Sequence, residues 1–112
     1  TDGTLTVAST GVAVAGSGNI LLGAGETVEA TAADIALNAS VTSAAGNISL
    51  IAKDGVAQSA AGDITTAGGT ADVKADGAIA MADGAVTQTA GGNIRYEAAA
   101  GNVTINVDDS TN

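Results

Sequence analysis

Short runs in which every second residue is apolar recur along the whole chain. Examples are Leu5-Thr6-Val7, Ile35-Ala36-Leu37, Ile48-Ser49-Leu50 and Val103-Thr104-Ile105. Such period-two alternation is typical of a β-strand with one buried face. Gly-Asn, Asp-Gly, Gly-Gly and Ala-Gly separate the runs, and these pairs form turns because they tolerate positive φ. The pattern predicts about fourteen short strands, and no stretch keeps the apolar spacing of a helix for long enough to predict one.

Isoleucine and valine recur at a regular spacing. Most of the isoleucines that follow a turn are 15 or 16 residues from the next, in the series Ile20, Ile35, Ile48, Ile64, Ile79 and Ile94. A second apolar anchor follows about half a period later, in the series Val12, Val28, Val41, Val56, Val73, Val86 and Val103. Residues 55–64 are also echoed by residues 85–94, which indicates a 30-residue super-period. A period of this size is the signature of a repeat architecture.

Many short strands joined by tight turns predict an all-β fold, a parallel β-helix or β-solenoid that we expect to be right-handed, in which each turn of the coil hydrogen-bonds to the next. Two geometries fit. A two-faced coil would take about 15 residues per turn and stack Ile on Ile. A triangular coil would take about 22 to 23 residues per turn, and the Ile and Val positions would then precess around the core. We expect one β-solenoid over residues 1–107 and a polar tail over residues 108–112.

The alternation also predicts which side chains face the interior. Residues two apart in a strand point to the same side. We expect the six isoleucines to face inward together with Leu22, Leu37, Leu50, Met81 and Tyr96. The residues between them should face outward, and these are Ala36, Ser49, Ala80 and Arg95.

The composition favours a thin core and a surface without nucleic-acid affinity. Tyr96 is the only aromatic residue, Cys, His and Pro are absent, and Ala and Val supply most of the apolar fraction of 46%. The formal net charge of −9 is dispersed along the chain, which suits a soluble coat and argues against contact with nucleic acid or an anionic membrane. No run is long enough to span a bilayer. The chain starts at Thr1 without Met, so we expect a processed product or an excised piece.

Catalysis is not predicted, because the chain lacks the His and Cys side chains that usually serve as bases, nucleophiles and soft metal ligands. The acidic pairs Glu26–Glu29, Asp72–Asp76 and Asp108–Asp109 are interpreted as solvated edges or turns. The glycines between Gly16 and Gly25 lack the Lys-Ser/Thr context of a nucleotide loop. We predict no catalytic, cofactor-binding or metal-binding residues and no cofactor.

An Asx residue recurs before several of the predicted strands, about one per turn of the coil, in the series Asn19, Asp34, Asn47, Asp63 and Asn93. These side chains could form a ladder or cap turns. Calcium is the alternative, but the Gly-Gly-x-Gly-x-Asp repeat of such sites is absent. The triplets that begin at Asn38, Asn47 and Asn102 match the glycosylation acceptor pattern, which arises by chance in such sequence. A threonine array that orders ice-like water is a weaker hypothesis, since only Thr4 with Thr6 and Thr87 with Thr89 show the spacing.

Runs such as Gly46-Asn47-Ile48-Ser49-Leu50 and Gly62-Asp63-Ile64-Thr65-Thr66, which alternate with Gly-Ala-Val segments, resemble the β-helical shafts of filamentous-haemagglutinin-like adhesins. The resemblance implies a right-handed parallel β-helix, export to the bacterial cell surface, and a role as shaft or adhesive surface. Neighbouring repeats of a larger parent chain would then be its partners, with any host ligand left open. A second hypothesis is an extracellular filament subunit that polymerises end to end through uncapped strands.

Overall fold

The computed structural model of the chain describes residues 2–29 and 31–106. These residues form thirteen short β-strands and no helix. The strands are β1 (Leu5–Val7), β2 (Val12–Val14), β3 (Ile20–Ala24), β4 (Ile35–Leu37), β5 (Val41–Ser43), β6 (Ile48–Ala52), β7 (Val56–Gln58), β8 (Ile64–Thr66), β9 (Ala71–Ala75), β10 (Ile79–Met81), β11 (Thr87–Thr89), β12 (Ile94–Ala98) and β13 (Val103–Ile105).

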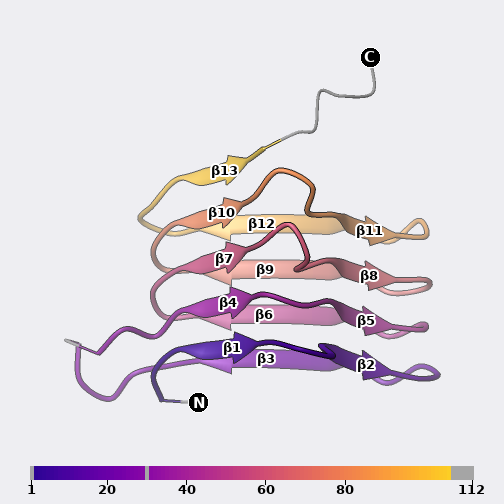
Figure 1. Cartoon of the computed structure of the whole chain (residues 1–112), viewed down its shortest axis with the longest axis horizontal. Helices are drawn as coiled ribbons and strands as arrows, with labels where there is room; N and C mark the ends of the chain where they lie inside the picture. Colours follow the sequence, from indigo (N-terminus) through magenta and orange to yellow (C-terminus); the bar gives the residue numbers. More distant parts are fainter. Residues whose placement is uncertain (1, 30, 107–112) are drawn as a thin grey trace.

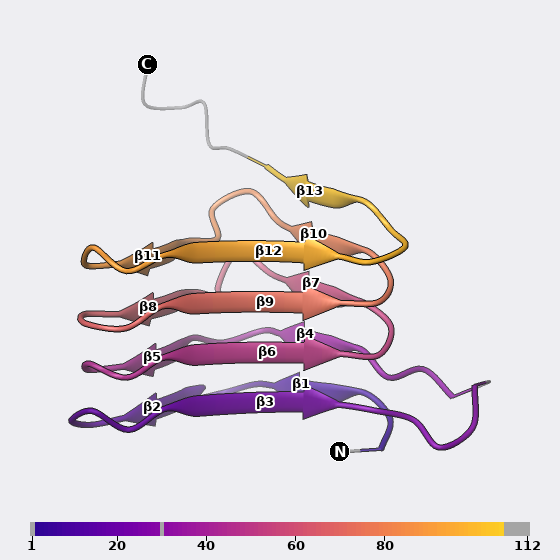
Figure 2. The ribbon, with the colours of Figure 1, turned by 180° about the vertical axis from the view of Figure 1, so that it is seen from behind.

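The strands build a three-sided coil, as Figures 1 and 2 show. The first side is the sheet β1-β4-β7-β10-β13, the second is β2-β5-β8-β11, and the third is β3-β6-β9-β12. All the strand pairs are parallel. In Figure 1 the nearer strands run to the right, the farther ones return to the left, and each turn lies above the one before, so the coil is right-handed. The predicted parallel β-solenoid is confirmed.

The length of one turn of the coil follows from the pairing of the strands. Ile48 pairs with Ala71, and Ala71 pairs with Ile94, so stacked residues on the third sheet are 23 positions apart once the first turn is complete. The step is also 23 on the second sheet, and on the first sheet it is 21 between β4 and β7 and 24 between β10 and β13. The first turn is longer, because Ile20 pairs with Ile48. Its additional residues lie in the connection 25–34 between β3 and β4, whereas residues 53–55 suffice between β6 and β7. The triangular geometry is therefore correct, and the two-faced coil with its shorter turn is wrong.

The 15-residue spacing of isoleucine has a simple origin in this geometry. It corresponds to two sides of the triangle, so that successive isoleucines fall on different sheets: Ile64 in β8, Ile79 in β10 and Ile94 in β12. Isoleucine consequently stacks on valine more often than on itself, as in the column of Ile35, Val56, Ile79 and Val103. The precession expected for a triangular coil is confirmed.

The core is a single column of apolar side chains inside the triangle. Ile35, Leu37, Ile48, Leu50 and Ile64 are fully buried. The intervening Ala80 and Arg95 are exposed, and Ala36 and Ser49 are partly exposed, as the alternation predicts. Leu22 and Tyr96 are partly buried against the same core. The assigned register is therefore correct.

Ile94 is the exception among the six predicted core isoleucines. It faces inward with Tyr96 but is 46% exposed. The reason is its position in β12, the last strand of its sheet, so that no further described strand covers it. Val103 and Ile105 of β13 are also exposed, at 40% and 51%. The prediction that Ile94 faces inward is confirmed, but alternation gives only the direction of a side chain, and burial also requires a neighbouring turn.

Candidate functional site

The most regular polar feature of the coil is the corner between the second and third sheets. Thr66, at the end of β8, is 1% exposed. Its Oγ1 donates a hydrogen bond to the carbonyl oxygen of Gly46 one turn earlier (2.7 Å) and accepts one from the backbone nitrogen of Gly69 (3.1 Å). Ser43 makes the same pair of contacts one turn before, with Gly18 and Gly46 at 2.9 Å each. The hydroxyl side chains thus satisfy backbone groups that the corner removes from the sheets.

Glycine is required at this corner because consecutive turns approach very closely there. A Cβ added at Gly69 would lie 2.2 Å from the carbonyl oxygen of Gly46, and one added at Gly92 would lie 2.0 Å from that of Gly69. Both distances are far below an ordinary van der Waals contact. A column of Gly18, Gly46, Gly69 and Gly92 therefore runs along the coil beside the hydroxyl column. The 23-residue spacing of Thr66 and Thr89, and of Gly69 and Gly92, is the sequence signal that reveals the true turn length.

The predicted Asx ladder connects neighbouring turns. The Oδ1 atom of Asn19 accepts a hydrogen bond from the backbone nitrogen of Asn47 (2.8 Å), and that of Asn47 accepts one from Thr70 (2.9 Å). Asp34 and Asp63 do the same at the other two corners, toward the backbone nitrogens of Gly55 (2.7 Å) and Val86 (2.9 Å). The side chains bond to backbone N–H groups one turn later, so the predicted ladder is present as hydrogen bonds from side chain to backbone.

A small polar cluster lies inside the otherwise apolar coil near its C-terminal end. Gln58 is 2% exposed, although it occupies the column of Leu37 and Met81. Its Oε1 accepts a hydrogen bond from the Tyr96 hydroxyl (2.8 Å), and its Nε2 donates to Thr87 Oγ1 (3.2 Å). Burial raises the pKa of Tyr96, and its hydrogen bond with Thr87 opposes that effect. The apolar alternation does not predict this cluster, although the position of Gln58 two residues after the inward-facing Val56 places its side chain inside the coil.

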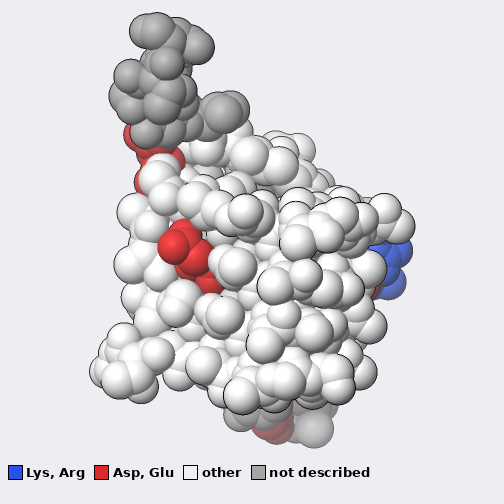
Figure 3. Space-filling model, turned by 90° about the vertical axis from the view of Figure 1, so that its right-hand side faces the viewer, with Lys and Arg blue, Asp and Glu red and all other residues white. Residues whose placement is uncertain are grey.

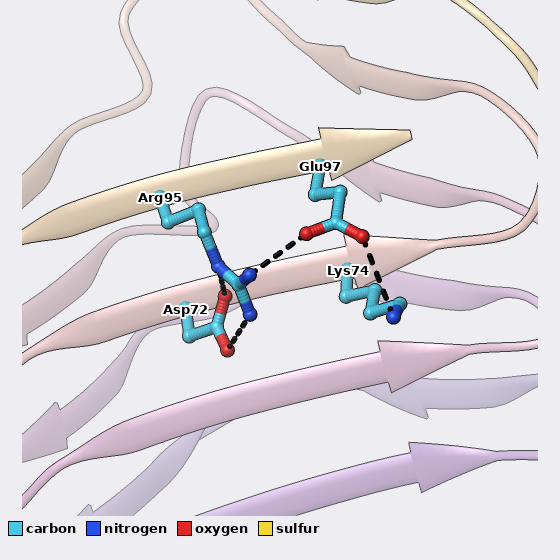
Figure 4. A network of polar contacts seen from close by, with 4 residues as sticks. All are labelled: Asp72, Lys74, Arg95 and Glu97. Atoms are coloured by element: carbon cyan, nitrogen blue, oxygen red, sulfur yellow. Dashed lines mark hydrogen bonds and ion pairs between the residues drawn. The ribbon is translucent and has the colours of Figure 1, made fainter. Parts of the chain in front are cut away.

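A network of ion pairs covers the outer face of β9 and β12 (Figure 4). Arg95 contacts both carboxylate oxygens of Asp72 at 2.8 Å and also reaches Glu97 (2.8 Å), which pairs with Lys74 (3.4 Å). The hydrogen bond from Arg95 lowers the pKa of Asp72. Lys53 forms a separate pair with Asp76 at 2.8 Å and lowers the pKa of that carboxyl. The predicted pair Asp72–Asp76 is therefore divided between two cations, each exposed to solvent.

The long connection 25–34 gathers acidic residues at one corner of the first turn. Asp2 anchors it by accepting hydrogen bonds from Thr27 (3.2 and 3.0 Å), and Asp54 anchors it by accepting one from Ala33 (2.8 Å). Glu26 Oε2 is buried and has no hydrogen-bond partner among residues 2–29 and 31–106. Desolvation, assisted by the charges of Asp54 and Glu29, raises the pKa of Glu26. Of the other predicted acidic pairs, Asp108–Asp109 lies outside the described residues.

The outer faces of the first two sheets carry mostly small, uncharged side chains. The first sheet presents Ala36, Ala57 and Ala80 outward, and these alanines form the floor of a shallow apolar groove. Figure 3 shows the neighbouring side of the molecule with a small acidic area and cationic atoms only at its margin. Thr87 and Thr89 point inward, and the residues stacked on Thr6 in the next two turns are Ala36 and Ala57, so these residues make no threonine array. No group of acidic residues within the described ranges is arranged to hold a metal ion.

Comparisons with protein-family models, curated proteins and solved structures found no match to this chain. The described part of the chain contains no helix of the length and apolar character needed to cross a membrane. The proposals below consequently rest on the geometry of the coil and on the sequence.

Proposed function

We propose that this chain is a structural shaft segment of a secreted bacterial surface adhesin, without catalytic activity. The observation that carries the proposal is the C-terminal end of the coil. There β13 begins a fifth turn above β10, while no described strand covers β11 or β12. The inward-facing Ile94, Val103 and Ile105 are left 40 to 51% exposed. An apolar end of this kind needs a cover, and another turn of the coil is the cover that matches it.

Other features support a role as a spacer. The outward side chains of the first sheet are mostly alanine and threonine, and the cations Lys53, Lys74 and Arg95 are each paired with acids. The polar groups with strict geometry, Thr66 among them, serve the stacking of turns. The runs Gly46–Leu50 and Gly62–Thr66, which resemble adhesin shafts, lie at the corners and strands of this stack.

The alternative is a filament subunit that polymerises end to end, and the same exposed apolar side chains favour it. A copy would bring its first turn, β1 to β3, onto this end. Because β13 already occupies the place above β10, the next open place is above β11. The copy's three-residue β2 would then face the five-residue β12, and its five-residue β3 would face the three-residue β13. This mismatch leaves backbone groups unpaired and favours the shaft.

Antibodies raised against this chain test the proposal in the organism that encodes it. For a shaft segment, they should label intact, unpermeabilised cells, and the labelled product should migrate far above the 10.5 kDa of this chain. Labelling that requires permeabilisation would contradict the surface location. A native product near the mass of this chain that forms fibres would support the filament subunit instead.

A further inference from the structure

We propose that the face above β11 and β12 is a strand-addition site, selective for one further coil turn that carries a hydroxyl residue, then glycine, then an Asx or Thr residue at its corner. The occupant is an adjoining repeat of the same parent coil. This inference rests on the proposed shaft function and names the partner and the chemistry of its recognition.

The Asx side chains of the coil form hydrogen bonds to the next turn. Asn19, Asn47, Asp34 and Asp63 each use Oδ1 to accept a hydrogen bond from a backbone N–H one turn later. Asn93 occupies the same position, immediately before β12, above Thr70 and Asn47 in the stack. It is exposed, and within residues 2–29 and 31–106 its side chain has no hydrogen-bond partner. Its carboxamide oxygen is therefore available to accept a backbone N–H from an additional turn.

The open edge of β12 and the exposed Ile94 beside it also fit an added strand. β12 is five residues long and pairs with β9 on one side only. The backbone groups on its open edge can accept a parallel strand, as those of β9 accept β12. Ile94 points into the coil interior yet is 46% exposed, whereas Ile48 in the same column is fully buried. A strand added above β12 would bury Ile94 as β9 buries Ile48.

The close approach of the glycines at the corner determines which sequence the occupant needs. At this corner each glycine lies directly over the backbone of the previous one, and a Cβ at Gly92 would lie 2.0 Å from the carbonyl oxygen of Gly69. The residue placed over Gly92 must therefore also be glycine. The segment 64–75, which spans β8, Gly69 and β9, fits because it already stacks in this way on residues 41–52. In that position Thr70 would donate its backbone N–H to Asn93, as it does to Asn47.

A synthetic peptide with the sequence of residues 64–75 tests the proposal on the intact chain, with a matched peptide carrying Gly69→Val as control. Binding is followed by NMR of the backbone and side-chain amides and by the fluorescence of Tyr96, the only aromatic residue. We expect saturable shifts at Asn93, Ile94 and Tyr96 with the first peptide and none with the second. In the protein, Asn93→Ala should weaken binding by about fivefold, the loss of one hydrogen bond. Asn93→Asp should retain it.

Asn102 provides an internal control, because it precedes β13 on another sheet and the peptide does not reach above it. Asn102→Ala should leave binding unchanged. Shifts located at β1 to β3, equal binding of the Gly69→Val peptide, or no binding at millimolar peptide would overturn the proposal. Self-association of the chain through Ile94, seen by sedimentation, would overturn the assigned occupant in favour of a second copy. The antibody labelling of cells is independent of these results, so a failure here leaves the shaft function to its own test.

Discussion

Thr66 Oγ1 lies 2.7 Å from the carbonyl oxygen of Gly46, which belongs to the preceding turn of the coil. Thr66 Oγ1 also accepts a hydrogen bond from the backbone N–H of Gly69, in the same corner as Thr66. One buried hydroxyl thus connects two turns and fixes the corner at which they approach most closely. This relationship makes the hydroxyl and glycine columns, as well as the isoleucines, part of what holds the stack together.

Replacing Thr66 by valine removes the hydroxyl while keeping the shape of the side chain. The carbonyl of Gly46 and the N–H of Gly69 would then lose a partner in the buried corner. We expect a loss of about 1 to 3 kcal/mol in the free energy of unfolding, measured by denaturant titration. Thr66→Ser should retain most of the stability. Thr65→Val is the matched control on the same strand, because Thr65 faces outward, and a cost at Thr65 equal to that at Thr66 would refute the role of the hydroxyl.

Gly69→Ala should destabilise the coil, because its Cβ would lie 2.2 Å from the carbonyl oxygen of Gly46. The turns must separate at the corner to admit it, at a cost of about 1 to 3 kcal/mol typical of overpacking. Gly23→Ala is the control, since a Cβ there would meet nothing within 4 Å. Thermal unfolding should show a lower melting temperature for the first variant and little change for the second. Equal melting temperatures would mean that the corner is looser than described.

Ile79→Asp and Ala80→Asp test which side of β10 faces the core. Ile79 is 1% exposed, so an aspartate there would bury a charge without a partner and cost about 3 to 5 kcal/mol. Ala80 is exposed, and the same substitution should change the unfolding free energy by less than about 0.5 kcal/mol. Chemical denaturation of both variants measures the difference. If Ala80→Asp were the more damaging change, the register would be wrong by one residue.

The ion pair between Asp72 and Arg95 predicts a dependence of stability on acid. Because Arg95 lowers the pKa of Asp72 in the folded chain, the unfolded chain binds a proton at this site at higher pH than the folded chain does. The stabilisation is therefore fully present above the unfolded pKa of about 4 and is lost as the pH falls through the lower folded value. Asp72→Asn should abolish this part of the pH dependence of stability. The difference in unfolding free energy between wild type and variant should therefore narrow below about pH 4.

Unfolding free energies measured between neutral and acidic pH check this prediction. Asp83→Asn serves as the control, because Asp83 is exposed and lies outside the network of Figure 4. A gap between wild type and Asp72→Asn that stays constant across the acidic range would contradict the contribution of this ion pair.

The sequence predicted the fold class and the direction of the side chains for a local reason. Alternation in runs such as Ile48-Ser49-Leu50 depends only on the pleat of one strand, and Ile48 and Leu50 are indeed fully buried. The length of a turn is a different kind of information, because it depends on which strands lie side by side. The strong 15-residue spacing of isoleucine records two sides of a triangle. The weaker 23-residue spacing of Thr66, Thr89, Gly69 and Gly92 records the stack itself.

The interior polar cluster and the exposed Ile94 were missed for related reasons. Gln58 is hydrophilic, and its burial depends on Tyr96, which lies 38 positions later in the chain and supplies a hydrogen bond. Ile94 has the pattern of a core residue, but no described strand lies above it. Both features depend on the neighbouring turn, and the alternation within one strand carries no information about that turn.

The coil is built of modular turns, and after the first turn most stacked residues are separated by the same step as Ile64 and its partner Thr87. Duplication of one turn tests this geometry most directly. Residues 64–86 contain β8, β9 and β10 and return the chain to the place where it started, one level higher. Inserting a second copy of this segment after Val86 should keep the β-type circular dichroism spectrum and raise the unfolding free energy, because the new turn buries core on both sides. Duplicating residues 64–78, in step with the isoleucine spacing, should shift every later strand to another sheet and lower the unfolding free energy. Tolerance of the shorter insertion, with loss of stability from the longer one, would contradict the three-sided coil.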